Sequence, residues 1–420
     1  MLGLFAKSFG VVSVLFLSIM VATLGSNFSS EKLPGSRASY YEVMAVLSGD
    51  QTNVKLMNET DSLALVAFYK ETNGGNWSNK NNWLTGPVTS WFGVTVTNGR
   101  VTRLELPLNN VAFTGQSYDE RILPAEIGQL TELEVLNLER NDRLARIPPE
   151  IGELVNLKEL NLAGCHTSGN YVDIVKLVKL EKLNLSLNTF GGELPAEIGN
   201  LIHLKELDLS GQSNSNFRGA IPAEITNLTQ LEILNLSDNY LSGLPDLSPL
   251  DPIIGNGVLS EVIIDDNAFT FGDIEPNYSL SFAFSYANQY LKGPIDEYEG
   301  NELTLYASVG GAFSQYQWYK DGLPINGATG ERYKIGPVTR DVVGQYEVEA
   351  TNTLVTDLVL RSFPWEVEFI EEYTSKWLDI GAYHHAYSES GARHWGSQAP
   401  AGMEYPAILR HSGHIISNAF

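Results

Sequence analysis

The side chains best suited to metal binding or acid–base chemistry gather near the C-terminal end of the sequence. Imidazole and carboxylate groups are common ligands of transition metals, so a metal site is one interpretation of this cluster. The spacing matches no metal-binding motif, which favours ordinary exposed or hydrogen-bonded histidines. The residues concerned are His384, His385, His394, His411 and His414, with Asp379 and Glu389 nearby.

No catalytic motif is found elsewhere. The sequence has no Gly-x-Ser-x-Gly elbow, no phosphate-binding glycine loop with lysine, and no His-Glu-x-x-His. Carboxylates are paired at Asp265/Asp266 and Glu371/Glu372, but nothing supplies a nucleophile beside its base. We therefore expect a protein that is not an enzyme and that uses no cofactor or metal.

A repeated leucine pattern dominates the middle of the chain. Leucine, two residues, leucine, one residue, leucine recurs with start-to-start spacings of 32, 24, 23, 24, 27 and 28 residues. One repeat cannot bury its leucines alone, so neighbouring repeats must stack around a shared core. About seven copies are predicted, starting at Val101, Leu133, Leu157, Leu180, Leu204, Leu231 and Leu259.

Alternation within each short strand separates core residues from surface residues. Leu136 and Leu138 are two residues apart and point to one face, whereas Asn137 points to the other. Asn141 comes three residues later, where a buried amide can bond loop backbone, and Cys165 holds this place in the third copy. The outward residues form a polar, net acidic, concave surface, which suits protein or glycan ligands better than a small apolar molecule. This candidate ligand-binding set comprises Arg103, Glu105, Asn137, Glu139, Glu159, Asn161, Lys182, Asn184, Glu206, Asp208, Asn235 and Ser237.

The second half of each copy identifies the type of repeat. Leu-Pro-Ala-Glu-Ile-Gly-Gln-Leu at 123–130 has close counterparts at 147–154, 194–201 and 221–228. With Gly191-Gly192-Glu193-Leu194-Pro195, these segments resemble the plant-type leucine-rich repeat. The resemblance implies an α/β solenoid with a parallel β-sheet on its concave face, over residues 101–277.

An N-terminal cap is expected at residues 60–100, because the first leucine row would otherwise face water. An amphipathic helix from Asp61 precedes Trp77, Trp83 and Trp91, and we favour cap packing over a ligand platform for these tryptophans. The segment resembles the cap of plant-type repeats in a cysteine-free form, with Val96 at the cysteine position, as in bacterial surface proteins. Gly402-Met403-Glu404-Tyr405-Pro406 likewise resembles long secreted proteins of the Bacteroidetes group.

Short alternating runs in residues 286–362 predict antiparallel strands. Trp318 and Tyr346 resemble the core tryptophan and the tyrosine corner of an all-β immunoglobulin-like sandwich. The usual cysteine pair falls at Ala307 and Val348, so apolar packing replaces the bridge. Such a domain serves as a spacer or as a binding module. Residues 363–420 form a C-terminal segment, and we expect the natural chain to continue beyond Phe420.

Composition limits the partners and the compartment. A formal net charge of −23 makes nucleic-acid binding unfavourable and disfavours anionic lipid. Lys7 and the apolar stretch 11–24 predict a signal peptide over residues 1–26, with an uncleaved anchor as the alternative, followed by a linker at 27–59. No later segment resembles a membrane span. A single cysteine permits no internal disulfide, which fits export from a bacterium.

These observations predict a secreted or cell-surface protein that binds a protein or glycan ligand through the concave face, in adhesion or recognition. Two alternatives remain open. The repeats and the sandwich could be targeting modules of a larger secreted enzyme, or the solenoid could be a purely structural part of a surface layer.

Overall fold

The computed structural model describes residues 57–112, 122–141, 144, 146–168, 171–212, 216–291, 293–299 and 302–368, with the backbone of 409–411 and 414–416. The predicted signal peptide, most of the linker and most of the C-terminal segment with its histidines lie outside these residues. The last two stretches pair as the antiparallel strands β20 (Leu409–His411) and β21 (His414–Ile416).

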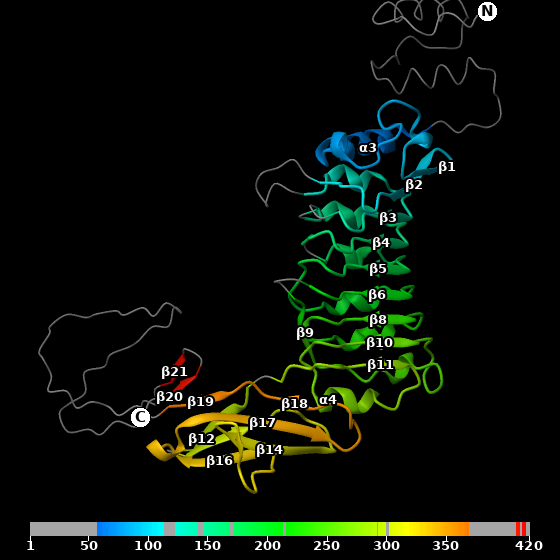
Figure 1. The fold of residues 1–420 in the computed structure, drawn as a ribbon. Helices are drawn as coiled ribbons and strands as arrows, with labels where there is room; N and C mark the ends of the chain where they lie inside the picture. The colour runs from blue at the N-terminus through cyan, green and yellow to red at the C-terminus, as the bar shows by residue number, and fades with distance from the viewer. Residues whose placement is uncertain are drawn as a thin grey trace, which may run out of the picture. The chain divides into compact units, whose positions relative to one another are not determined.

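One nine-stranded sheet contains the leucine pattern, and Figure 1 shows its strands stacked in chain order. An antiparallel strand β1 (Val94–Thr97) opens it and pairs with β2 (Arg100–Glu105). From β2 onward all neighbours are parallel, and the register aligns equivalent positions of successive copies, as in Leu160 beside Leu183 and Leu183 beside Leu207. The parallel strands are β3 (Val135–Asn137), β4 (Glu159–Asn161), β5 (Lys182–Asn184), β6 (Glu206–Asp208), β8 (Ile233–Asn235), β10 (Glu261–Ile263) and β11 (Ala283–Ser285).

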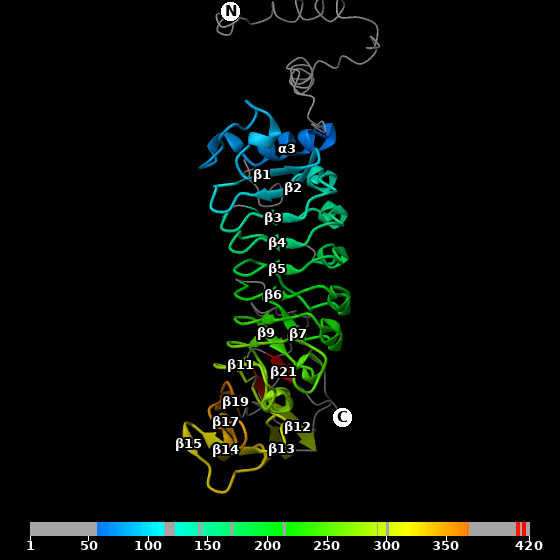
Figure 2. The same ribbon diagram turned by 90° about the vertical axis from the view of Figure 1, so that its right-hand side faces the viewer.

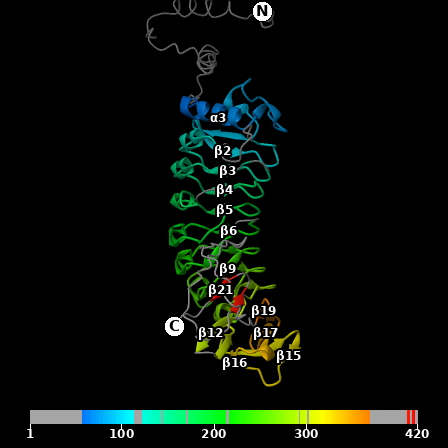
Figure 3. The ribbon, with the colours of Figure 1, turned by 90° about the vertical axis from the view of Figure 1, so that its left-hand side faces the viewer.

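Short 3-10 helices of the repeats stack along one edge, and four of them directly follow a proline (Figures 2 and 3). These prolines, which have an extended backbone, are Pro124, Pro148, Pro195 and Pro222. The proline ring fixes φ near the value that this position requires. Gly199 allows close packing, because a Cβ there would lie 2.5 Å from the carbonyl oxygen of Glu224. The 3-10 helices of the repeats are η4 (Ala125–Gln129), η5 (Pro149–Glu153), η6 (Ile174–Lys176), η7 (Ala196–Asn200), η8 (Ala223–Asn227) and η9 (Ser248–Leu250).

The predicted leucines form the core of the stack. Leu104, Leu136, Leu160, Leu183, Leu207 and Leu234 are at most 2% exposed, as are the leucines two residues later. Burial of such side chains contributes roughly 1.5–3 kcal/mol each, so the shared core is the main stabilising contribution. The solenoid and its parallel sheet are therefore present as the pattern predicted.

A ladder of buried side chains links the copies behind the sheet. The Asn141 side chain accepts hydrogen bonds from the backbone N–H groups of Asn109 and Val111 and donates to the carbonyl of Leu106, 2.8 Å away. Cys165 takes the equivalent place, and its thiol donates to the carbonyl of Leu138 at 3.0 Å. Because each side chain bonds backbone of the preceding copy, the ladder fixes the distance between repeats.

Residues before the first parallel strand cover the end of the core. They form helix α3 (Glu59–Glu71), η1 (Gly74–Asn76) and η2 (Val88–Ser90). Trp77, Trp83 and Trp91 are at most 6% exposed, with ring centroids 4.9 and 4.6 Å apart along the series. Each indole N–H donates to a backbone carbonyl, so these rings pack and offer no open ligand platform. Asp61 lies within the first turns of α3 and is fully buried.

The sheet continues one strand beyond Asn277, where the sequence analysis ended the repeats. β11 pairs with β10, and Gln289 bonds the carbonyl of Ile264 as a further step of the ladder. A short helix α4 (Phe271–Ile274) and η10 (Glu275–Asn277) precede this strand. Residues 281–289 are therefore an eighth copy, in which Phe284 and Tyr286 occupy the leucine positions.

Two antiparallel sheets follow. The first has the order β12 (Ile295–Glu299), β13 (Glu302–Tyr306), β16 (Arg332–Pro337). The second has the order β15 (Leu323–Pro324), β14 (Ser314–Lys320), β17 (Gly344–Asn352), β18 (Leu360–Arg361), with β19 (Trp365–Val367) also pairing β17; η11 (Arg340–Val342) precedes β17. Trp318 and Val348 are fully buried, and Tyr346 is nearly so.

Candidate functional site

All twelve predicted binding residues lie in the parallel strands or directly after them, at positions that alternate with the buried leucines. We call this set the sheet face; it comprises Arg103, Glu105, Asn137, Glu139, Glu159, Asn161, Lys182, Asn184, Glu206, Asp208, Asn235 and Ser237. None of the twelve is buried. The structure thus brings them together on one surface.

The Asn/Asp column of the sheet face has a structural role as well. Asn184 Oδ1 accepts hydrogen bonds from the backbone N–H of Ser186 at 3.0 Å and from its hydroxyl at 2.7 Å. Asp208 bonds Ser210 and Asn235 bonds Ser237 in the same way. These are local turns that end each strand, so one oxygen of each side chain is already engaged.

Charged residues on and beside the sheet face form ion pairs between neighbouring strands. Lys182 on β5 pairs with Glu206 on β6, whereas Arg103 pairs with Glu105 within the same strand, β2. The hydrogen bond from Arg103 lowers the pKa of Glu105. Just before the strands, Lys158 Nζ lies 3.0 Å from Glu134 and Lys205 Nζ lies 2.7 Å from Glu181. In the N-terminal strands the acidic groups are therefore largely balanced.

That balance ends in the C-terminal repeats. Every charged residue from 206 to 291 other than Arg218 is acidic. Glu261 is exposed on β10, and Asp265 just after β10 accepts a hydrogen bond from Ser285 Oγ at 2.8 Å. The predicted set omitted both residues, although the strand alternation at Val262 and Ile264 would have found them. This part of the surface carries an uncompensated negative charge.

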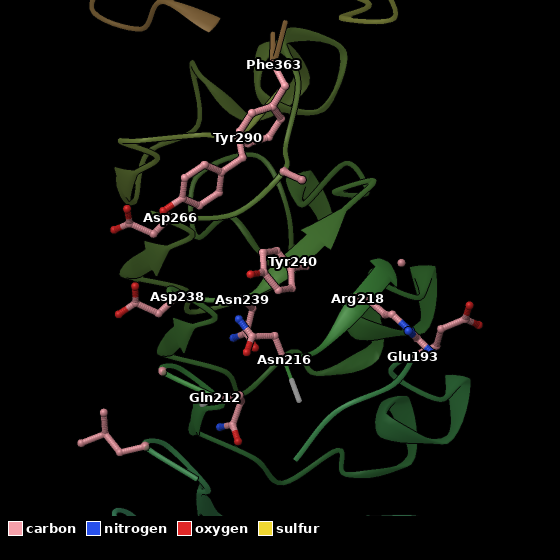
Figure 4. A pocket seen from close by; sticks show the side chains of 14 residues that line it. Glu193, Gln212, Asn216, Arg218, Asp238, Asn239, Tyr240, Asp266, Tyr290 and Phe363 are labelled. Atoms are coloured by element: carbon pink, nitrogen blue, oxygen red, sulfur yellow. The ribbon is translucent and has the colours of Figure 1, made fainter. Parts of the chain in front are cut away.

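A second candidate site lies where the C-terminal repeats leave the sheet and turn toward β7 (Arg218–Ala220) and β9 (Tyr240–Ser242), which pair with each other in parallel. It is an open depression of about 970 Å³. Figure 4 shows Tyr240 and Tyr290 in it, with Asp238 and Asp266 on one side and Arg218 with Glu193 on the other. No sequence pattern pointed to this place, because its residues come from the variable positions of several copies. We call it the tyrosine pocket.

The described residues include neither a cluster of potential metal ligands nor a helix that could span a membrane. Among them, no three His, Cys, Asp or Glu side chains lie close enough together to hold a metal ion. The histidines predicted as alternative metal ligands fall outside the part of the chain whose side chains are described. No helix within the described ranges is both long and apolar enough to cross a bilayer.

Comparison with known families identifies the repeats. A family model described as Leucine Rich Repeat matches residues 179–201 and 230–250. These ranges contain β5 with η7 and β8 with η9. The repeats of the chain are thus leucine-rich repeats. The chain matches no curated protein.

Several solved structures are similar to part of this chain at low identity. A plant ice-binding protein is 22% identical, over 57% of this chain and 90% of that one, with a TM-score of 0.37. The PEPR1–AtPEP1 complex gives 21% identity over 56% of this chain and 36% of that one, with a TM-score of 0.41. The ectodomain of the receptor kinase SOBIR1 from Arabidopsis thaliana gives 20% identity over 56% and 99%, with a TM-score of 0.30.

Proposed function

We propose that the chain is an exported, non-enzymatic recognition protein whose sheet face binds a protein partner. The main support for this proposal is the alternation of buried leucines and outward polar residues, which is repeated over successive strands. The outward residues add nothing to the core, so their identity is set by other requirements. A broad polar face of this kind suits a macromolecular ligand better than a small apolar one. A glycan ligand, a role as targeting module and a purely structural role are the rival interpretations.

The excess of acidic groups from residue 206 onward favours a partner with a basic patch. Such complementarity acts chiefly on the association rate and on the choice of partner, and it weakens as salt is added. The paired charges at Lys182 and Glu206 must be separated or shared when a partner docks. Binding should therefore depend more on Glu261 and the neighbouring carboxylates than on that pair.

A photo-crosslinking amino acid at Glu159 or Glu261 tests which surface is used. Both side chains belong to the sheet face or its direct continuation, in β4 and β10. Glu197 and Glu224, on the 3-10 helices of the same region, are exposed controls. Crosslinking of the same extracellular protein from both strand positions, and from neither helix position, is the expected result. Equal crosslinking from the helix positions would contradict the proposal.

Charge reversal then tests recognition once that partner is in hand. The double variant Glu159→Lys/Glu261→Lys should weaken binding about tenfold or more, because like charges would then face the basic patch. Glu197→Lys/Glu224→Lys makes the same change in net charge on another surface and should have little effect. Asp208 is avoided, because its bonds to Ser210 end strand β6 and its loss would disturb the fold.

We further propose that residues 286–362 contain an immunoglobulin-like sandwich that extends the repeat domain as a spacer. Support comes from the two antiparallel sheets and from Trp318, whose indole donates to the carbonyl of Gly330 at 2.8 Å. The Tyr346 hydroxyl donates to the carbonyl of Val342, as a tyrosine corner does. Ala307 and Val348 are buried, as residues at the positions of the usual inter-sheet disulfide should be.

Engineered cysteines test that packing. In a Cys165→Ser background, Ala307→Cys/Val348→Cys should oxidise to an internal disulfide, because the proposed sandwich would place the two positions opposite each other. Ala307→Cys/Glu347→Cys should stay reduced, since Glu347 points to the opposite face of β17. A disulfide in both variants or in neither, measured by mass after alkylation, would refute the proposed arrangement.

A further inference from the structure

The tyrosine pocket is built from two columns of variable positions. The first column lies directly before the buried ladder residue of each copy and has a left-handed backbone throughout. Asp238 and Asp266 occupy it in two successive copies, with φ of 55° and 54°. Elsewhere the same position holds Leu108, Arg140, Gly164, Leu187, Gly211 and Asn288. The backbone thus accepts many residue types, and the fold does not require two aspartates.

The second column lies directly after the ladder residue. Tyr240 and Tyr290 occupy it on either side of Ala268. The Ala268 N–H donates to the carbonyl of Leu241 at 2.9 Å, and the Tyr290 N–H donates to the carbonyl of Asn267 at 2.6 Å, so the three positions are consecutive steps of the stack. Two strand spacings amount to about 10 Å, so the small Ala268 side chain leaves a slot between the positions that carry the two rings.

Both rings are available to a ligand. Tyr240 is 61% exposed and Tyr290 is 45% exposed. Phe363, 63% exposed, also lines the depression. Aromatic faces separated by a slot can stack on both sides of a flat group. Burial, with the nearby Asp266 and Asp238, raises the pKa of Tyr290, so its ring stays uncharged at neutral pH.

The charges around the slot determine which kind of planar ligand it should favour. Asp238 and Asp266 lie on the same side of the two rings, while Arg218 lies at the far end of the pocket near Glu193 (Figure 4). A cation between the rings would gain both cation–π attraction and a carboxylate partner. Guanidinium is planar, stacks on aromatic faces and binds carboxylates through two parallel hydrogen bonds, whereas ammonium is a compact, strongly hydrated point charge.

We propose that the tyrosine pocket binds an arginine side chain of a basic peptide segment, with the guanidinium between Tyr240 and Tyr290 and paired with Asp238 or Asp266. The site is separate from the sheet face, and it does not depend on the function proposed for that face. It would add a second contact to a protein partner that reaches around the edge of the sheet, or bind a basic segment alone.

The test measures fluorescence anisotropy of a fluorescein-labelled arginine–glycine repeat peptide with the full chain. A peptide with lysine in place of arginine, and one with citrulline, the neutral planar analogue, serve as comparators. We expect saturable binding of the arginine peptide, weaker binding of the lysine peptide and no binding of the citrulline peptide. Equal binding of the citrulline peptide would overturn the proposal, because charge would then be irrelevant.

Three variants probe the slot itself. Asp238→Asn/Asp266→Asn should weaken the arginine peptide about tenfold, and asparagine tolerates the left-handed backbone. Ala268→Phe should abolish binding by filling the slot at unchanged charge. Tyr240→Ala should lower the affinity for the arginine peptide about three- to tenfold. Circular dichroism checks that each variant is folded.

Control variants separate this site from general electrostatics and from the sheet face. Glu197→Gln/Glu224→Gln removes two charges from exposed 3-10 helices of neighbouring repeats and should leave affinity nearly unchanged. An equal loss in this control would overturn the proposal in favour of nonspecific attraction. Loss only in Glu159→Lys/Glu261→Lys would assign the peptide to the sheet face. Binding of cellohexaose or chitohexaose that Ala268→Phe removes, without peptide binding, would make the slot a saccharide site.

Discussion

Replacing Asn188 with alanine should destabilise the solenoid far more than replacing Asn184, four residues earlier in the same repeat. Asn188 is fully buried, whereas Asn184 is half-buried on the sheet face. The Asn188 side chain accepts hydrogen bonds from the backbone N–H groups of Cys165 and Thr167, both at 3.0 Å. It donates to the carbonyls of Leu162 and Leu185 at 2.7 and 3.0 Å. Three of these four partners belong to the preceding repeat.

The expected magnitude follows from the groups left without partners. Asn188→Ala strands two buried N–H groups and removes a donor from three carbonyls, those of Leu162, Leu185 and Ser186. Each unsatisfied buried group costs roughly 1–3 kcal/mol. Partial relaxation and residual water access reduce the sum, so we expect a loss of about 3–5 kcal/mol. Asn184→Ala removes only the bonds to Ser186, which water can replace, and should cost about 0.5–1.5 kcal/mol.

Urea unfolding of the full chain, followed by far-ultraviolet circular dichroism, measures both losses. The denaturant slopes must be compared first, because a repeat domain can lose cooperativity and a changed slope would make the midpoint misleading. Asn188→Asp provides a further variant: it keeps the acceptor oxygens but loses the donor and buries a charge, so it should be no more stable than Asn188→Ala. Similar losses for Asn184→Ala and Asn188→Ala would refute the distinction between the two columns.

Three further outcomes are expected. Asp61→Asn should cost about 2–3 kcal/mol in the same urea assay, because the fully buried Asp61 carboxylate binds Arg100 through two 3.0 Å hydrogen bonds; a variant as stable as the native chain would contradict this. Cys165 should react with a thiol reagent only at the rate of unfolding, since its side chain is fully buried, and rapid labelling of the native chain would refute that burial. Burial alone would raise the pKa of Asp251, yet hydrogen bonds from Ser281 and nearby backbone lower it from 3.8 to about 2. The ionised Asp251 carboxylate therefore stabilises the folded state fully above about pH 4, and this stabilisation is lost as the pH falls through 2. In Asp251→Asn the free energy of unfolding should change less between about pH 4 and pH 2 than in the native chain.

The sequence predicted the solenoid because its core follows a strict rule. Leucines that recur in phase can be buried only by stacking, and the structure places them as expected. The end of the repeats was harder to predict, because the eighth copy replaces leucine with Phe284 and Tyr286 and asparagine with Gln289. Aromatic rings can fill the same inward positions, so the strand persists although the leucine pattern stops.

The ladder shows a similar limit. Gln212, like Gln289, stands where the remaining copies have asparagine or cysteine, and its amide still bonds the carbonyls of Leu185 and Leu209. A search for asparagine alone misses it, since a longer side chain can reach the same backbone groups from a slightly different loop. The ladder position requires a buried side chain that can hydrogen-bond the backbone groups around it, and more than one residue type can do so.

The tyrosine pocket could not be predicted from any single motif, because it depends on which copies become neighbours. Comparison within a column recovers it once the register is known. Cys165 and Gln212 differ from the asparagine found in most copies, but their side chains still donate to the equivalent backbone carbonyls. Their presence is therefore explained by the fold. Tyr240 and Tyr290 bond none of these carbonyls with their side chains, and their rings remain exposed. Aspartate suits the left-handed backbone at positions 238 and 266, but the same column also holds leucine, arginine and glycine, so the fold requires neither carboxylate.

In a repeat protein, residues that depart from their column without serving the stack are the strongest candidates for recognition. The sheet face meets this criterion only in part, because its asparagines also end the strands. Its charged residues vary more freely, from Arg103 to Glu159, Lys182 and Glu261 in equivalent places. Both proposed sites therefore depend on residues that the fold leaves free to vary. Variants at these positions should alter binding while leaving unfolding nearly unchanged, whereas variants in the ladder should do the reverse.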